Sequence, residues 1–120
     1  MHLFEENIKN LGLNIPELPK ALANYVPYKI VGKTMYISGQ APVQNGELIY
    51  KGKVGSDITI EDGIEAARLC VTNIIAAVKA GLEGDWGKLD SFVKLTGFVN
   101  CQDDFTDQPK IINGASDLLV

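Results

Sequence analysis

Residues 60–82, IEDGIEAARLCVTNIIAAVKAGL, carry the strongest secondary-structure signal in the sequence. Apolar side chains recur there at spacings of three and four, the periodicity of a helix with one buried face. Thr59 stands where an N-cap is expected, and Asp62 follows in the capping-box position. Gly81 and Gly84 predict the end of the helix. The predicted buried stripe consists of Ile60, Ile64, Ala67, Val71, Ile74, Ile75, Val78 and Leu82.

Short β-rich runs precede this helix. Residues 28–31 (YKIV) and 34–38 (TMYIS) flank a two-residue loop that contains glycine, which is typical of a tight hairpin. A second turn at 44–47 contains the Asn-Gly pair that readily adopts positive φ. It leads into 47–54 (ELIYKGKV), which we expect to hold another short strand.

After the helix, residues 91–100 (SFVKLTGFVN) alternate in a way that predicts a strand. One face would carry Val93, Leu95 and Val99, which we expect beneath the long helix. The other face, Phe92, Lys94, Thr96 and Phe98, would meet a partner, a cleft or plain solvent. Residues 108–120 then predict a second helix, with Pro109 at its first position.

The order of elements indicates a single α+β domain over residues 1–120, built in two layers. Residues 1–26 read as an N-terminal arm, because a short helical run is followed by the proline-punctuated stretch NIPELPKALANYVP. A sheet that has just received its second helix normally needs a return strand. We therefore expect the chain to be incomplete at its C-terminus and prone to poor solubility or altered assembly.

Composition limits the classes of function. The chain has 120 residues, 46% of them hydrophobic and 22% charged, which is typical of a globular protein. Its net charge is −4 and its Lys and Arg residues are scattered, so we expect no nucleic-acid partner. Apolar runs are too short for a membrane span, and the N-terminus MHLFEENIKN does not resemble a secretory signal. We expect a cytoplasmic protein without a membrane partner.

Few residues are suited to nucleophilic or metal chemistry. Cys70 and Cys101 lie far apart and form no CxxC pair, so reduced thiols are expected. His2 is the single histidine and sits at the terminus. A Ser-His or Cys-His pair and a zinc site are therefore not expected.

Three stretches of the chain resemble the RidA/YjgF family, whose members were once labelled translation inhibitors or endoribonucleases. They are ANYVPYKIVGKTMYISGQAPV (23–43), GKVGSD with EDGIEAARLCVTN (52–73), and VKLTGFVNCQDDFTDQPKIINGASDLLV (93–120). The SGQ-x-P string after a strand, combined with VKLTGFV later, is fairly specific. The ANYVP and FTDQPKIINGAS strings are similar to a branch that bears an extra N-terminal arm.

The resemblance implies a fold similar to chorismate mutase of the bacillus type, with a two-layer mixed β-sheet backed by two helices. It also implies homotrimers whose sheets together form a closed, barrel-like core, with a ligand cleft between subunits. The best-known family activity is hydrolysis of reactive enamines and 2-imino acids to 2-oxo acids and ammonia. No cofactor or metal takes part, and the ligand is a small molecule that bears a carboxylate.

Such a reaction needs a cation or several N–H donors for the carboxylate, a water for the imine carbon, and proton donors for the leaving nitrogen. In the family, an arginine in a late strand grips the carboxylate and a glutamate on the final strand helps to position the water. The resemblance places both beyond Val120. Arg68 matches a different element, the first long helix, and is expected to be solvated or at an interface. No catalytic residue is therefore assigned within this chain.

The resemblance carries substrate binding onto a few positions. Tyr25 matches a tyrosine that borders the family's cleft, although it can equally pack the arm. The SGQ string presents backbone N–H groups and a hydroxyl to the ligand in the family, or simply ends its strand here. The predicted substrate-binding residues are Tyr25, Ser38, Gly39, Gln40 and Asn113.

The start of the second helix departs from the family pattern. Phe105 matches a family phenylalanine, for which we expect a core role. Well-studied members have an asparagine four residues later, where this chain has Pro109. Asn113 can substitute from the next helical turn. This departure puts the familiar substrate preference in doubt.

Three functions stay open at this point. The first is RidA-like hydrolysis of enamines and imines, impaired in a chain that lacks the late strands. The second is a non-catalytic, trimeric protein that binds a small ligand or regulates through the same cleft. The third is RNA cleavage, which would need a basic groove and a group that activates a nucleophile, and neither is evident in the sequence.

Overall fold

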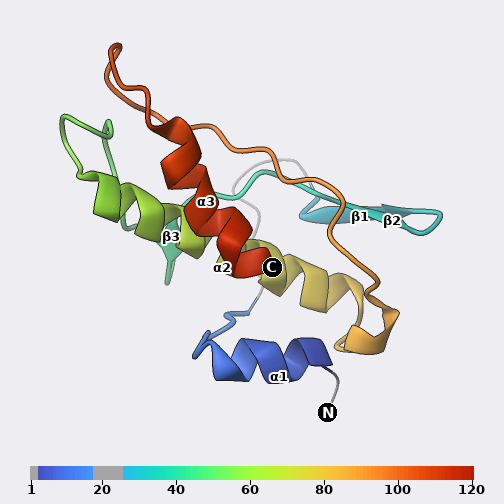
Figure 1. Cartoon of the computed structure of the whole chain (residues 1–120). Helices are drawn as coiled ribbons and strands as arrows, with labels where there is room; N and C mark the ends of the chain where they lie inside the picture. The colour runs from blue at the N-terminus through green and yellow to red at the C-terminus, as the bar shows by residue number, and fades with distance from the viewer. Residues whose placement is uncertain (1–2, 18–25) are drawn as a thin grey trace. The chain divides into compact units, whose positions relative to one another are not determined.

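The computed structural model of the chain describes residues 3–17 and 26–120. These residues form two compact units: a first unit of Met1–Gly39 and Thr72–Ser91, and a second unit of Gln40–Val71 and Phe92–Val120. The elements in chain order are α1 (Leu3–Asn10), β1 (Tyr28–Val31), β2 (Thr34–Ile37), β3 (Val43–Gln44), β4 (Glu47–Leu48), α2 (Ile60–Gly81), the 3₁₀ turn η1 (Trp86–Lys88) and α3 (Gln108–Leu119) (Figure 1). The expected mixed α+β class is confirmed.

The first unit contains the predicted hairpin. Strands β1 and β2 pair antiparallel, from Tyr28 opposite Ile37 to Val31 opposite Thr34. Gly32 has φ 61, the left-handed backbone that this tight loop requires. The hairpin packs on the C-terminal end of α2 in the same unit. A Cβ at Gly81 would lie 2.6 Å from the Met35 methyl carbon and 3.3 Å from the Tyr28 ring.

Both ends of α2 are capped by the expected residues. The Asp62 backbone N–H donates to the Thr59 hydroxyl at 3.1 Å, which confirms Thr59 as the N-cap. The helix ends at Gly81, and the chain then turns through two left-handed residues, Glu83 (φ 53) and Gly84 (φ 78). The N–H groups of these two residues donate to carbonyls of the last helical turn at 3.1 and 3.0 Å, in the pattern of a Schellman motif.

The predicted apolar stripe of α2 is buried toward its C-terminal end and half-buried toward its start. The buried members are Val71, Ile75, Val78 and Leu82. Asn73, Ala76 and Ala77 are also buried, although they lie outside the stripe. The C-terminal half of the helix is therefore covered on more than one side, which periodicity alone did not indicate.

In the second unit, β3 and β4 form the predicted turn. Val43 pairs with Leu48 and Gln44 pairs with Glu47 in an antiparallel ladder. The strand expected over residues 47–54 ends at Leu48, and of the later residues Val54 forms isolated bridges with Ile58 and Cys101.

Helices α2 and α3 approach each other closely within the second unit because glycine stands at both contact points. A Cβ at Gly114 would lie 2.8 Å from the Ile64 Cγ2 atom and 2.8 Å from the Ile64 carbonyl oxygen. A Cβ at Gly63 would lie 2.7 Å from the Ile111 Cδ1 atom. Figure 1 shows α3 running beside the first half of α2. The sequence predicted Pro109 at the first position of this helix. Since α3 begins at Gln108, Pro109 is instead its second residue.

The prediction of a strand over residues 91–100 is wrong. The segment is extended, but within the described chain its backbone forms no ladder, and only the Asn100 carbonyl accepts a backbone bond, from the Val54 N–H at 2.9 Å. Val93 is 89% exposed and does not pack beneath a helix, whereas Leu95 and Val99 are half-buried. The alternation specified an extended chain, but a strand also needs a partner to satisfy its N–H and C=O groups.

Candidate functional site

The predicted ligand-facing string begins where β2 ends, in the first unit. The Ser38 N–H donates to the Pro27 carbonyl at 3.0 Å, and the Ser38 hydroxyl donates to the Val26 carbonyl. Gly39 follows and is exposed, with no atom within 4 Å of the position that a Cβ would take. A serine that is held by two hydrogen bonds thus precedes an exposed residue without a side chain. Tyr25, the predicted neighbour of this string, lies outside the described residues.

The other two predicted residues belong to the second unit. Gln40 is half-buried. Asn113 lies on the exposed side of α3, where its side-chain oxygen accepts a hydrogen bond from the Ser116 hydroxyl at 3.3 Å. The carboxamide of Asn113 is therefore oriented by its own helix. The binding roles of all these residues stay predictions.

A loop cluster in the second unit sets where α2 and α3 begin. The Asp57 carboxylate accepts from the Lys53 N–H at 2.9 Å, and the Asn100 side-chain amide donates to the Gly52 carbonyl at 3.3 Å. Gly52 (φ 110) lies against the Asp57 side chain, and Gly55 (φ 93) lies beneath Gln102 and Phe105. These loops are tied to each other by backbone and side-chain bonds, which positions the two helices rather than opening a site.

Gln108 is a positioning residue that sequence reasoning missed. Its side-chain NH₂ donates to the Phe105 carbonyl at 2.7 Å and to the Cys101 sulfur at 3.5 Å. Phe105 is half-buried, with its ring against Gly55, in keeping with the expected core role. The available signal was a long amide side chain at the first position of the predicted helix, close to the turn that precedes it.

The titratable side chains of the described residues are not arranged as a nucleophilic centre. Burial raises the pKa of the Cys70 thiol to about 11, so at neutral pH it is not a thiolate. Cys70 and Cys101 are both free thiols. The Arg68 Nε atom lies 4.0 Å from the Glu65 carboxylate on the same helix, and the arginine side chain is 38% exposed. Arg68 is thus a partly solvated helix-surface residue.

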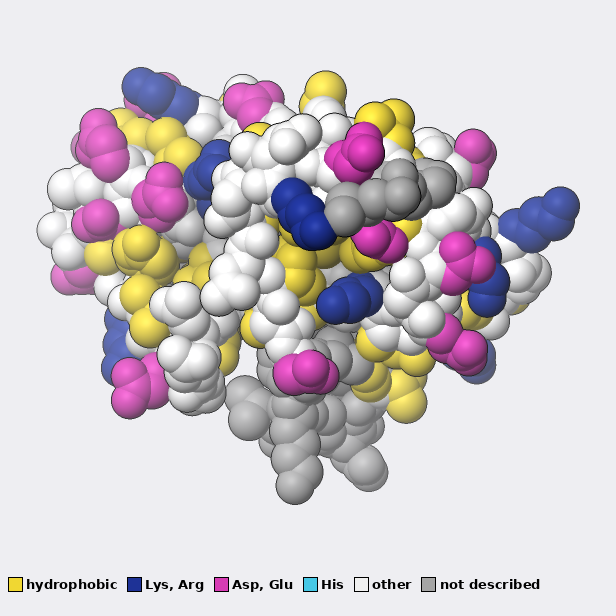
Figure 2. All heavy atoms as spheres, turned by 90° about the horizontal axis from the view of Figure 1, so that it is seen from below, with side chains coloured by type: hydrophobic (Ala, Val, Ile, Leu, Met, Phe, Trp, Pro, Cys, Tyr) yellow, Lys and Arg dark blue, Asp and Glu magenta, His cyan; other side chains and the backbone are white. Residues whose placement is uncertain are grey.

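The charged surface is mixed in sign. Figure 2 shows Lys and Arg side chains interspersed with Asp and Glu on the face in view. Among the described residues, no group of three or more His, Cys, Asp or Glu side chains is placed to hold a metal ion. The helices in the described parts of the chain are all too short or too polar to cross a bilayer.

The fold and the sequence strings together define the protein class. The family model described as "YjgF/chorismate_mutase-like, putative endoribonuclease" matches residues 5–120. The chain belongs to this YjgF/chorismate-mutase-like family, which confirms the resemblance found in the sequence.

Individual relatives support the same assignment. The chain is 35% identical to Protein TCP17 of Trypanosoma cruzi over 114 residues, which cover 95% of this chain and 71% of that protein. It resembles the crystal structure of Atu1372 from Agrobacterium tumefaciens, a protein of unknown function, with a TM-score of 0.87 and 42% sequence identity. The match covers 97% of this chain and 71% of the Agrobacterium chain. It also resembles the crystal structure of a "putative endoribonuclease" from Shewanella oneidensis MR-1, with a TM-score of 0.89 and 38% sequence identity. This match covers 95% of this chain and 75% of the Shewanella chain.

Proposed function

We propose that this chain is a subunit of a cytoplasmic enzyme that hydrolyses 2-imino acids and their enamine tautomers. Water adds to the imine carbon and gives a carbinolamine. The nitrogen then takes up a proton, the carbon–nitrogen bond breaks, and ammonia leaves a 2-oxo acid behind. Neither an oxidant nor a cofactor is required, so the subunit has only to bind the carboxylate, admit water and supply protons.

The observation that carries the proposal is the contrast between Ser38 and Gly39. Ser38 donates its hydroxyl proton to the Val26 carbonyl and its N–H to the Pro27 carbonyl, and these two bonds fix the end of β2. Gly39 then offers backbone with open space where a side chain would stand. Backbone N–H groups held in this way are suited to binding a carboxylate. Gln40, Asn113 and Tyr25 stay further candidate contacts of the substrate, as predicted from the sequence.

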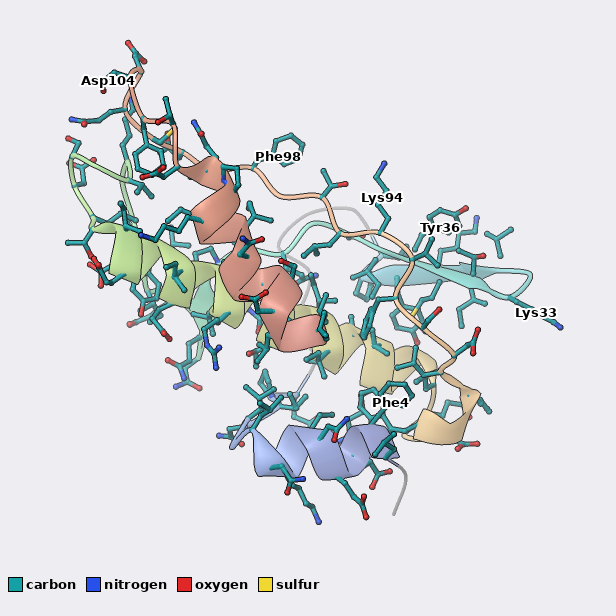
Figure 3. The ribbon with its side chains drawn as sticks, viewed as in Figure 1. Phe4, Lys33, Tyr36, Lys94, Phe98 and Asp104 are labelled. Atoms are coloured by element: carbon teal, nitrogen blue, oxygen red, sulfur yellow. The ribbon has the colours of Figure 1, made fainter. Side chains whose placement is uncertain are left out.

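We further propose that the subunit works as a homotrimer. Val93 and Phe98 are 89% and 94% exposed, although large apolar side chains on one segment are normally covered. Figure 3 shows the Phe98 side chain directed away from α3, on a stretch whose backbone forms no ladder with the other described residues. Pairing with another subunit would bury these side chains and satisfy the backbone. Sedimentation velocity tests this: a compact monomer at micromolar concentration would contradict it.

The decisive assay is ammonia release from 2-iminopropanoate, generated in situ from alanine by an amino-acid oxidase. Two forms are compared: this chain, and a fusion that adds the family's late strands with their arginine and glutamate. We expect the fusion to accelerate release above the buffer rate, and this chain to do so weakly. If neither form does, the hydrolytic proposal is wrong.

Gly39→Ala is the sharpest variant for this assay. The added methyl has open space in the free protein, so stability should change by less than about 0.5 kcal/mol. It would intrude where the ligand approaches the backbone, so the fusion should lose about tenfold or more in kcat/KM. The control is Gly84→Ala, which also has open space but lies in the turn after α2; because Gly84 has φ 78, this variant should lose about 1 kcal/mol of stability and still leave activity unchanged. Equal activities of the two variants would remove Gly39 from the site.

A second candidate is a non-catalytic protein that binds the same class of ligand. It is favoured by the position of Arg68, which pairs with Glu65 on its own helix. Binding of a 2-oxo acid without ammonia release, measured by calorimetry, would support this candidate. RNA cleavage, suggested by the words used for the family and the Shewanella relative, is tested in parallel with labelled RNA. The net charge of −4 argues against it.

A further inference from the structure

The sequence contains two Asn-Gly pairs, Asn45-Gly46 and Asn113-Gly114. The carboxamide carbon of asparagine can be attacked by the backbone nitrogen of the next residue. Glycine in that next position hinders the attack least, because it has no side chain and allows the widest range of backbone angles. Both pairs belong to the second unit, but they stand in opposite environments.

Asn45 and Gly46 form the exposed turn between β3 and β4. Their φ angles are 54 and 80, and no atom lies within 4 Å of the position of a Cβ on Gly46. Among the described residues, the Asn45 carboxamide has no hydrogen-bond partner. The ladder that holds this turn consists of two residue pairs. A hairpin this short opens readily, so the turn can sample the backbone angles needed for ring closure.

Asn113 and Gly114 lie inside α3, where the same dipeptide is held. Gly114 is buried, and its Cβ position is 2.8 Å from both the Ile64 Cγ2 atom and the Ile64 carbonyl oxygen. The Asn113 side-chain oxygen accepts from Ser116. Helical backbone angles keep the Gly114 nitrogen away from the carboxamide carbon, and the contact with Ile64 opposes any local opening.

We propose that Asn45 is a site of spontaneous deamidation and isoaspartate formation, and that the fold protects Asn113. The Gly46 nitrogen loses its proton to water or hydroxide and bonds to the Asn45 side-chain carbonyl carbon. The carbon–NH₂ bond then breaks and ammonia leaves, which gives a five-membered succinimide. Water opens the ring at either carbonyl, so position 45 becomes an aspartate or an isoaspartate. The net change is the loss of ammonia and the gain of water.

The product has two physical consequences. The chain gains one negative charge beyond its net charge of −4. In the isoaspartate form the main chain also gains a methylene between residues 45 and 46. A two-residue turn with positive φ at both positions cannot absorb that extra atom, so the β3–β4 ladder is lost.

The test uses the folded chain aged at mildly alkaline pH and digested with trypsin. Cleavage after Lys33 and Lys51 isolates Asn45 in peptide 34–51, and cleavage after Lys110 isolates Asn113 in peptide 111–120. Mass spectrometry measures deamidation of each peptide, and an isoaspartyl methyltransferase reports the isomer. We expect the 34–51 peptide to deamidate about tenfold or more faster than the 111–120 peptide.

Ageing the chain in denaturant separates structure from sequence. Without the fold the two pairs should react at similar rates, so the tenfold ratio should fall toward one. Asn45→Gln should abolish the slow acidic shift of the folded chain on ion exchange, whereas Asn113→Gln should leave it unchanged. Equal rates in the folded chain, or faster reaction of the 111–120 peptide, would overturn the proposal.

Discussion

Replacing Gly114 with alanine provides a quantitative test of the helix packing. Alanine in place of glycine inside an exposed helix normally stabilises by about 1 kcal/mol, because it restricts the unfolded chain. In α3 the added Cβ would lie 2.8 Å from the Ile64 Cγ2 atom, 2.8 Å from the Ile64 carbonyl oxygen and 3.3 Å from the Ile64 Cα atom. Two of these three atoms are backbone, so no rotamer change of Ile64 relieves the overlap.

The two helices must therefore separate. Carbon atoms pack best at about 3.5–4.0 Å, so the Cβ requires a displacement of roughly 0.7–1.2 Å at this point. Overpacking of this kind costs about 1–3 kcal/mol, and the backbone contact places Gly114→Ala at the upper end of that range. After the helix-propensity gain is subtracted, a net loss of about 2 kcal/mol is expected. For a chain of this size the melting temperature should fall by roughly 8 °C.

Urea and thermal unfolding, followed by circular dichroism, measure this loss directly. The matched control is Asp117→Ala, which places the same residue type on the exposed side of the same helix. It should change the free energy of unfolding by less than about 0.5 kcal/mol. If Gly114→Ala proves as stable as the parent or more so, the close approach of α2 and α3 is refuted.

Three further predictions concern single side chains. Thr59→Ala removes the acceptor of the Asp62 N–H and should lower the free energy of unfolding, measured in urea, by about 1 kcal/mol. Thr59→Ser keeps a hydroxyl acceptor and should retain most of that stability. Glu83→Gly should stabilise by about 1 kcal/mol, because Glu83 has φ 53; equal or lower stability would contradict this. Cys70 should react with iodoacetamide at least about tenfold more slowly in the folded chain than in denaturant. Because its folded pKa is raised to about 11 from 9.0, stability should fall as pH rises from 9 to 11, and Cys70→Ala should flatten that decline.

The elements that were predicted correctly are those whose signals are local. Thr59 and the 3–4 periodicity after it specify α2 through bonds and contacts within a few residues. The β1–β2 hairpin follows from a two-residue loop with Gly32 at positive φ. Helix α2 and the hairpin both depend on neighbouring residues, so the sequence alone is enough to predict them.

The features that were missed depend on distant partners. Asn73 is buried on a side of α2 that the apolar stripe does not mark. Residues 91–100 alternate like a strand, but alternation cannot say whether another strand is available to pair with them. The candidate site could be proposed from the sequence only by resemblance, because what distinguishes Gly39 is its open surroundings and not its residue type.

The bonds of Ser38 change how the SGQ string should be interpreted. Its hydroxyl proton is given to the Val26 carbonyl and its N–H to the Pro27 carbonyl, so neither can be donated to a ligand while the strand end keeps this form. A hydroxyl oxygen whose proton is already donated can act only as an acceptor, and a carboxylate has no proton to give. Donation to the proposed substrate must therefore come from the backbone that follows, beginning at Gly39. Under the proposed function, Ser38 therefore acts by holding that backbone in place, as a positioning residue rather than as a direct contact of the substrate.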